Sequence, residues 1–278
     1  MELLLRSIRY DSPLAAQGAA SSATPSHPFN LNLLQDFTEL VLTRNVSFLV
    51  GDNGCGKSTL LNGIAANAGL PTIGSTADSQ AAANAPLADR LTLVKNQPLG
   101  RGCYFRADQV ALFIQGTAQS WADHAAMVEE FAAIEGDWGR DRAQGLALGQ
   151  RRALSDRYGE DPTAKSHGEL YLNLLQQRIN VRGLYLLDEP ETPLSPTNQL
   201  GLIALLLDAV KERGCQFIIA THSPILLALP DAAIFDCNGR CPQLIAWEQT
   251  EHVSITRGFL NNPNQYLQHF IKPLRDDD

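Results

Sequence analysis

The sequence has no excess of basic residues, no long apolar run and no start that resembles a signal peptide. Lysine and arginine number 22 against 30 aspartates and glutamates, which gives a formal net charge of -8. This balance argues against a surface that coats nucleic acid or adheres to membranes, although a local basic stripe is compatible with an acidic total. The most apolar stretches, such as residues 200–210, are far shorter than a bilayer span. We therefore expect a soluble, cytoplasmic chain without membrane insertion.

The cysteines form no paired CxxC set. An odd number of thiols at long spacings favours reduced cysteines in a reducing compartment. The five are Cys55, Cys103, Cys215, Cys237 and Cys241. A disulfide at Cys55 would obstruct the glycine-rich segment in which it lies, so disulfide scaffolds are excluded.

Composition and length indicate one large α/β domain over residues 1–278. Hydrophobic residues make up 44% and charged residues 19% of the 278, which is ordinary for a globular domain with a substantial core. Residues 116–165 have helical composition broken by glycines, and we predict a helical insertion too short for a long coiled-coil arm. No internal repeat is evident.

The chain alternates between β-favouring runs and helical segments. This alternation predicts a mostly parallel sheet. The predicted strands are 3–10, 46–50, 91–94, 102–105, 183–187, 215–220, 233–236 and 244–247, and the predicted helices are 58–66, 169–179, 199–213 and 266–271.

A glycine-rich phosphate-binding motif follows the strand at 46–50. It reads Gly51-Asp-Asn-Gly-Cys-Gly-Lys57-Ser58 and matches G-x-x-x-x-G-K-[ST] without gaps. In such a loop, backbone N–H groups and the lysine hold phosphates, and the hydroxyl is a Mg²⁺ ligand. The alternative is a glycine-rich turn with a chance lysine, against which the order of strand, loop and helix argues. The predicted nucleotide-binding residues are Gly51, Asn53, Gly54, Cys55, Gly56, Lys57, Ser58 and Thr59.

Two acidic residues end the apolar strand at 183–187. We predict that Asp188 holds Mg²⁺ opposite Ser58, directly or through water. Glu189 is then placed to polarise an attacking water, which requires a carboxylate within hydrogen-bond reach. An ordinary Asp-Glu-Pro surface turn is the alternative.

A histidine, His222, ends the following strand in the phrase Ala220-Thr-His-Ser-Pro224. A lone histidine at the end of a strand is usually structural. Because it comes one helix and one strand after Asp188 and Glu189, we predict that His222 senses a terminal phosphate.

The segment Ser166-His-Gly-Glu169 opens the helix that precedes the acidic strand. A serine and a glycine at a helix N-terminus can bind an anion through the hydroxyl, the free N–H groups and the helix dipole. The same residues also fit an ordinary capping box between Ser166 and Glu169, and the sequence alone favours neither reading.

Together, these four elements resemble the ATP-binding-cassette (ABC) ATPases, and most closely the soluble branch with the Rad50, SMC and RecF proteins and compact bacterial "AAA family ATPases". The resemblance implies an α/β P-loop NTPase fold with an ABC-type core, a mostly parallel sheet, a small antiparallel N-terminal strand region and a short helical insertion. It also implies a head-to-tail homodimer that sandwiches ATP and Mg²⁺. Ser166, Gly168 and Glu169 of one chain would then face the phosphate held by Lys57 of the other.

Two positions depart from the family pattern or stay open. The signature reads Ser-His-Gly-Glu where transporters commonly have Leu-Ser-Gly-Gly-Gln. The glutamine expected to contact Mg²⁺ has three candidates in Asp108, Gln109 and Gln115, among which the sequence does not decide.

The sequence thus predicts an ATP hydrolase with Lys57, Glu189 and His222 as its catalytic residues. Three rivals use the same loop: the ATPase subunit of a transporter, a nucleotide-switched module that binds DNA or a protein, and a P-loop kinase. A carboxylate placed for water speaks against the kinase. A further hypothesis is that oxidation of Cys55 blocks nucleotide binding, since a helix N-terminus and Lys57 lie beside it.

Overall fold

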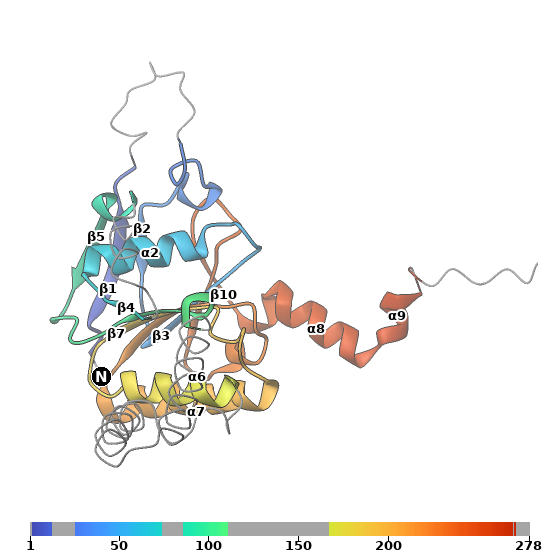
Figure 1. The fold of residues 1–278 in the computed structure, drawn as a ribbon. Helices are drawn as coiled ribbons and strands as arrows, with labels where there is room; N and C mark the ends of the chain where they lie inside the picture. Colours follow the sequence, from blue (N-terminus) through green and yellow to red (C-terminus); the bar gives the residue numbers. More distant parts are fainter. Residues whose placement is uncertain (1, 13–25, 74–85, 111–166, 269, 271–278) are drawn as a thin grey trace, which may run out of the picture.

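The structure is a computed structural model that describes residues 2–12, 26–73, 86–110, 167–268 and 270. The described residues form two β-sheets (Figure 1). The larger has seven described strands in the order β10-β9-β3-β8-β7-β6-β4, and all neighbours are parallel except the antiparallel pair of β10 and β9. Its strands are β3 Val46–Val50, β4 Thr72–Ile73, β6 Tyr104–Arg106, β7 Leu184–Asp188, β8 Gln216–Ala220, β9 Ala233–Asp236 and β10 Gln243–Ile245.

The smaller sheet is antiparallel and has the order β2-β1-β5. It consists of β1 Leu5–Tyr10, β2 Glu39–Val41 and β5 Leu91–Lys95. Buried Gln216 joins the two sheets, because its side chain accepts from the N–H of Leu5 (2.8 Å) and donates to the Leu5 carbonyl (2.9 Å). The predicted mostly parallel sheet and small antiparallel N-terminal region are both confirmed.

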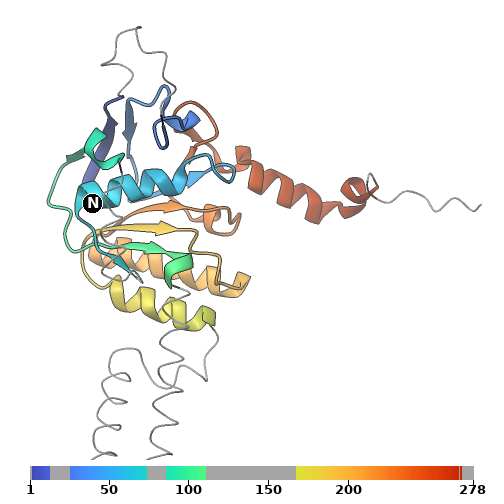
Figure 2. The same ribbon diagram turned by 45° about the horizontal axis from the view of Figure 1, so that its top comes forward.

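The described part of the chain has five α-helices. They are α2 Lys57–Ala68, α6 His167–Arg178, α7 Pro196–Arg213, α8 Glu251–Asn261 and α9 Pro263–Leu267, with short 3₁₀ turns η1 Asn32–Leu34, η2 Ala88–Arg90, η4 Leu226–Ala228 and η5 Trp247–Gln249. As Figure 2 shows, α2 lies between the two sheets, whereas α6 and α7 lie side by side on the opposite face.

Strand β7 is apolar from Leu184 to Leu187 because both of its faces are covered. Successive side chains of a strand point to opposite faces. Leu184 and Leu186 pack into the core with α2, and Tyr185 and Leu187 pack into the core with α6 and α7. All five β7 residues are therefore buried, and the same holds for β3 and β8, as expected for central parallel strands.

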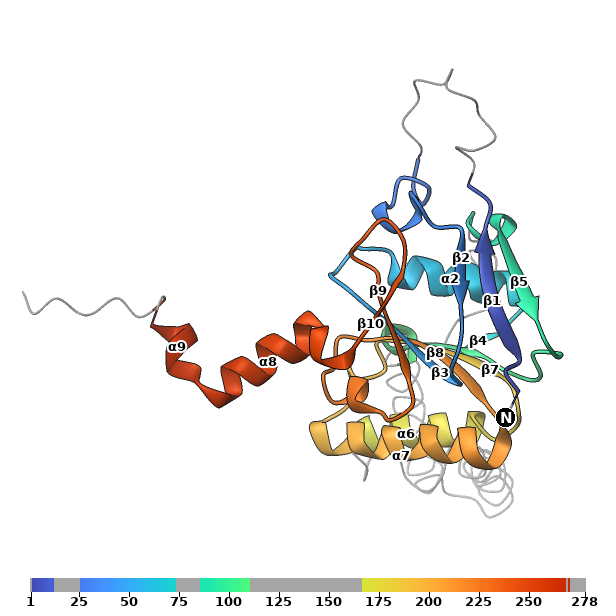
Figure 3. The same ribbon diagram turned by 180° about the vertical axis from the view of Figure 1, so that it is seen from behind.

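The C-terminal helices α8 and α9 leave the body (Figures 1 and 3). Val253 is the one buried residue of α8, and α9 has none. No helix among the described residues is long and apolar enough to cross a membrane.

The C-terminal prediction was partly wrong. The predicted helix at 266–271 is instead α9, which begins at Pro263 and ends at Leu267, because Pro263 suits a first helical position and Asn262 caps the helix by accepting from the N–H of Gln265. Helix α8 and the short strands β2 and β4 were not predicted. The predicted insertion at 116–165 lies outside the described residues.

Candidate active site

The phosphate-loop motif connects β3 to α2 through backbone that only glycine adopts easily. Gly51, Gly54 and Gly56 have φ angles of 141°, 82° and 114°. Gly56 is also the N-cap of α2, and no side chain caps that helix. The first N–H groups of α2 thus remain available to an anion at the positive end of the helix dipole.

Lys57 is folded back into the loop. Its side chain is buried, and Nζ donates to the carbonyl oxygens of Gly51 (2.7 Å) and Asp52 (2.9 Å). The Sγ atom of Cys55 lies 3.9 Å from the same ammonium group. The positive charge is therefore concentrated where the loop curls, as phosphate binding requires.

Asn238, which follows β9, holds the loop from outside. Its Oδ1 accepts from the N–H of Asp52 at 2.7 Å. A Cβ atom at Gly51 would lie 2.9 Å from that same Oδ1, so this contact depends on glycine. Asn238 was not predicted, since almost 190 residues separate it from the loop that it supports.

Asp188 and Ser58, the two predicted Mg²⁺ ligands, lie beside each other. The Ser58 hydroxyl donates to Oδ1 of Asp188 at 3.0 Å, and the buried Tyr104 hydroxyl donates to Oδ2 at 3.1 Å. Burial raises the pKa of Asp188, and the two hydrogen bonds oppose the rise. Tyr104 was not predicted, because no motif connects the three-residue strand β6 with the acidic end of β7.

The Ser58 and Asp188 oxygens fit Mg²⁺. One hydroxyl and one carboxylate are the donors that Mg²⁺ takes when substrate phosphates and waters fill its other positions. Within the part of the chain that the structure describes, no group of three or more histidine, cysteine, aspartate or glutamate side chains could enclose a metal ion. The donor set therefore suits a metal shared with a phosphate ligand.

Glu189 has a left-handed backbone conformation. Its φ of 49° is one of two positive values among the described residues other than glycine, and its N–H donates to the carbonyl of Ala220 at 2.9 Å. Such a conformation costs energy and persists at functional sites when the surroundings impose it. It brings the half-exposed carboxylate of Glu189 to the cavity beside the phosphate loop.

His222 is held by two groups that lie far from it in sequence. Its N–H donates to Oε1 of Glu191 at 2.7 Å, and its Nδ1 lies 2.8 Å from Nε2 of His252. Nε2 of His222 faces Oε1 of Glu189 at 3.7 Å. Burial lowers the pKa of His222, and the charges of Lys57 and His252 lower it further.

Glu191 is a partly buried acid that was not among the predicted site residues. Burial raises its pKa, against hydrogen bonds from the backbone of His222 and the hydroxyl of Thr221. Its position two residues after Glu189 is visible in the sequence, but its role in fixing the loop at His222 depends on the contact between β7 and β8.

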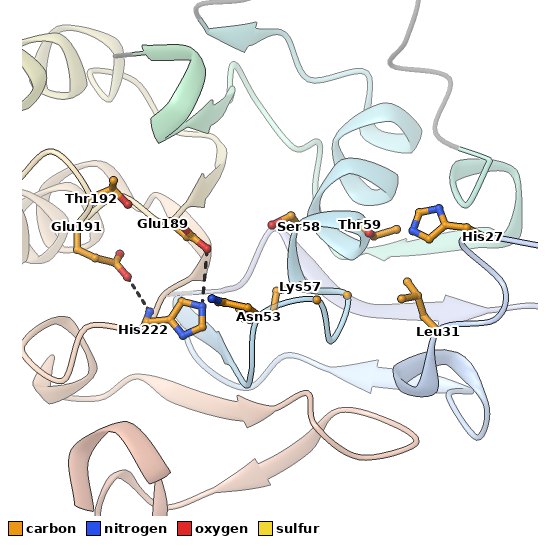
Figure 4. A pocket seen from close by; sticks show the side chains of 12 residues that line it. His27, Leu31, Asn53, Lys57, Ser58, Thr59, Glu189, Glu191, Thr192 and His222 are labelled. Atoms are coloured by element: carbon orange, nitrogen blue, oxygen red, sulfur yellow. Dashed lines mark hydrogen bonds and ion pairs between the residues drawn. The ribbon is translucent and has the colours of Figure 1, made fainter. Parts of the chain in front are cut away.

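A cavity of about 690 Å³ lies between the phosphate loop and the segments that carry Glu189 and His222 (Figure 4). In Figure 4, Glu189, Glu191, Thr192 and His222 lie on one side of the phosphate loop and His27 and Leu31 on the other. The lining comprises His27, Leu31, Asn53, Gly54, Gly56, Lys57, Ser58, Thr59, Glu189, Glu191, Thr192 and His222. His27 and Leu31 were not predicted, because they belong to a loop region without a motif.

The predicted signature lies elsewhere. Gly168 and Glu169 are not among the residues that line the cavity, and Ser166 lies outside the described residues. Gly168 packs tightly, since a Cβ there would lie 2.7 Å from Nδ2 of Asn198 and 3.0 Å from the carbonyl of Pro193. The two signature residues that the structure describes, Gly168 and Glu169, are therefore not at the cavity of their own chain.

The three candidates for the metal-contacting glutamine also differ. Asp108 is exposed and pairs with Arg106 at 3.0 Å. Gln109 has a buried Oε1 without a hydrogen-bond partner among the described residues, and Gln115 lies outside them. Neither Asp108 nor Gln109 lines the cavity.

Known proteins similar to this chain include ATP-binding proteins of other bacteria. Residues 165–228 match the family described as "AAA domain, putative AbiEii toxin, Type IV TA system". The chain is 30% identical over 214 residues to the lipoprotein-releasing system ATP-binding protein LolD of Bordetella avium (strain 197N), covering 77% of this chain and 89% of that protein. It is 27% identical over 210 residues to the energy-coupling factor transporter ATP-binding protein EcfA2 of Lactiplantibacillus plantarum, covering 71% of this chain and 65% of that protein. A solved ATP-binding cassette of an ABC transporter in its ADP conformation aligns with 98% of the chain at 15% identity and a TM-score of 0.42.

Proposed function

The chain belongs to the ABC-type P-loop ATPases, which bind and hydrolyse ATP, and we propose that it does so as a head-to-tail homodimer with ATP between the subunits. One observation carries this proposal. The cavity is lined by Lys57, Ser58, Glu189 and His222, whereas Gly168 is not among its lining residues. A second chain is needed to bring the signature to the nucleotide.

On this proposal, the phosphate loop binds the phosphates of ATP. The N–H groups from Gly51 to Thr59 and the ammonium group of Lys57 surround them, and Asn53, Gly54 and Cys55 belong to the same loop. Ser58 and Asp188 would hold Mg²⁺, which neutralises phosphate charge when bound. His27 and Leu31, on the far side of the loop, are placed to contact the rest of the nucleotide.

Glu189 and His222 carry the proposed chemistry. The carboxylate of Glu189 accepts a proton from the attacking water, and general-base catalysis of this kind contributes roughly 10²–10⁴-fold. His222 contacts the terminal phosphate from the same side, since its Nε2 lies 3.7 Å from Oε1 of Glu189. Ser166, Gly168 and Glu169 of the second subunit complete the site at the start of α6.

We also propose the bounds of the ATPase domain and its compartment in the cell. Residues 1–278 form one ABC-type ATPase domain, and residues 116–165 form a helical insertion within it. We place the domain in the cytoplasm, where ATP and reduced thiols are available. The five described cysteines are all free thiols, which fits that compartment.

On this proposal, ATP held in the homodimer drives a conformational switch. The sequence resemblance favoured the Rad50, SMC and RecF branch, but the comparisons support only the broader ABC-type family. The matched relatives LolD and EcfA2 are, by their names, ATP-binding proteins of a lipoprotein-releasing system and a transporter. These findings favour the transporter-subunit alternative over a nucleotide-switched module that binds DNA or a protein.

Complementation between two inactive variants tests the shared site. Lys57→Ala disables the phosphate loop, and Ser166→Glu places a negative charge at the signature. If each site combines both chains, a mixed dimer keeps one intact site, and about half of the dimers in an equimolar mixture are mixed. Mixing should therefore restore turnover that neither variant has alone. Turnover that stays absent after mixing, while wild-type protein exchanges subunits under the same conditions, would refute the shared site.

A second experiment separates the candidate partners. Affinity purification from detergent-solubilised membranes should recover an integral membrane protein if the chain is a transporter subunit. Turnover of the purified chain with and without duplex DNA is measured in parallel. Stimulation by DNA, with no membrane protein recovered, would favour the nucleotide-switched module instead.

A further inference from the structure

The contact between His222 and His252 joins the cavity to the C-terminal helix α8. Nδ1 of His222 lies 2.8 Å from Nε2 of His252, and the two rings meet edge to face with centroids 4.8 Å apart and planes at 63°. This distance is that of a hydrogen bond between ring nitrogens. The other ring nitrogen of His222, Nε2, has no hydrogen-bond partner among the described residues.

The body of the protein holds His252 in place. His252 is the second residue of α8, between Thr250 and Val253, which are exposed by only 1% and 2%. The Thr250 hydroxyl donates to the carbonyl of Trp247 at 2.7 Å, and Val253 belongs to the core that packs against α6 and α7. The first turn of α8 is therefore anchored, although the rest of the helix projects from the body (Figure 3).

The contact determines where the proton of a neutral His222 resides. In a neutral imidazole, one ring nitrogen donates and the other accepts. If Nε2–H of His252 donates to Nδ1 of His222, the proton of His222 is on Nε2 and points toward the cavity. In the reverse arrangement, a bare nitrogen lone pair of His222 faces the Glu189 carboxylate.

Electrostatics favours the first arrangement. A carboxylate only accepts hydrogen bonds, so a bare Nε2 at 3.7 Å from Oε1 of Glu189 would place two acceptors against each other. A phosphate in the cavity would add a further acceptor on the same side. We infer that His252 is a positioning residue that donates to His222 and thereby keeps the proton of His222 on Nε2, as a donor to the terminal phosphate. This inference rests on the proposed function of His222.

Nitrogen NMR of the histidine side chains tests the tautomer without any activity measurement. The six histidines are labelled with ¹⁵N, and the His222 ring is assigned by its loss in His222→Gln. We expect the neutral His222 ring of the wild-type protein to carry its proton on Nε2. A proton on Nδ1 would overturn the inference, whether or not the protein hydrolyses ATP.

Variants at His252 then test the consequence for turnover. His252→Leu removes the donor and should lower kcat about two- to tenfold, the worth of one hydrogen bond, with the affinity for a fluorescent ATP analogue unchanged. His252→Gln supplies an amide donor and should restore most of the rate. Thr256→Leu adds the same side chain to an exposed position of α8 and should have no effect.

The outcomes distinguish this inference from the proposed function. A His252→Gln protein as slow as His252→Leu would show that the hydrogen bond is not what matters and would overturn the inference. If His222→Gln loses turnover but His252→Leu does not, the result supports the proposed role of His222 and overturns the inferred role of His252. A wild-type chain that binds ATP without hydrolysing it would contradict the proposed function, while the NMR result would still decide the tautomer.

Discussion

The left-handed backbone at Glu189 should cost stability that a glycine would recover. A residue other than glycine with φ near 49° costs on the order of 1–3 kcal/mol, whereas glycine adopts this conformation freely. Glycine also loses about 0.5–1 kcal/mol more entropy on folding. The difference predicts that Glu189→Gly stabilises the nucleotide-free protein by about 1 kcal/mol relative to Glu189→Gln.

Two variants at one position separate backbone strain from chemistry. Glu189→Gln keeps the strained conformation and removes the carboxylate, and Glu189→Gly removes both, so turnover should be lost in each. Thermal unfolding by calorimetry should show Glu189→Gly melting about 2–4 °C above Glu189→Gln, the shift expected for about 1 kcal/mol in a domain of this size. Equal melting temperatures would refute the claim that the site stores backbone strain.

A matched control exists in the turn before β9. Asp231 is the other described residue besides glycine with a positive φ, at 58°, and it does not line the cavity. Asp231→Gly should give a smaller gain in stability, because aspartate tolerates this conformation better than glutamate, and should leave turnover unchanged. A loss of turnover in Asp231→Gly would show that glycine substitutions disturb the fold more widely.

Three other substitutions test separate contacts. Tyr104→Phe leaves Oδ2 of buried Asp188 without its donor and should lower the free energy of unfolding in urea by about 1–3 kcal/mol; no change would show that the contact has little weight. Burial raises the pKa of the Glu191 carboxyl above its usual 4.5, so the charged carboxylate destabilises the folded protein at neutral pH. Glu191→Gln removes this charge and should melt at a higher temperature than the wild type at neutral pH. This gain should vanish as the pH falls below about 4, because the carboxyl is then protonated in both the folded and the unfolded chain. A gain that persists in acid would contradict the assignment. Mild peroxide should reduce ATP binding in the wild type but not in Cys55→Ser, and equal loss in both proteins would exclude oxidation of Cys55.

Local patterns in the sequence were sufficient for the central part of the fold. The phosphate loop, its strand and its helix were predicted within two residues, because glycine spacing and an apolar run act over short distances. The acidic end of β7 and the histidine after β8 could also be predicted to meet the loop, because parallel strands bring their carboxyl ends to one edge of the sheet.

The groups that hold these residues could not be predicted in the same way. Tyr104 reaches Asp188 only because β6 pairs with β7, and His252 reaches His222 only because η5 and the first turn of α8 pack against the core after β10. These are long-range contacts between residues with no local pattern of their own. The positive φ of Glu189 likewise has no local signal, because glutamate rarely adopts this conformation.

The molar mass of Glu189→Gln in the presence of ATP tests the central claim most directly. This variant should bind ATP, barely hydrolyse it and therefore accumulate as the ATP-bound dimer. Light scattering after size exclusion should give twice the mass of the 30.3 kDa chain with ATP and Mg²⁺, and the single-chain mass with ADP or in Lys57→Ala. A Glu189→Gln chain that is saturated with ATP and remains a monomer would contradict a site shared between two subunits.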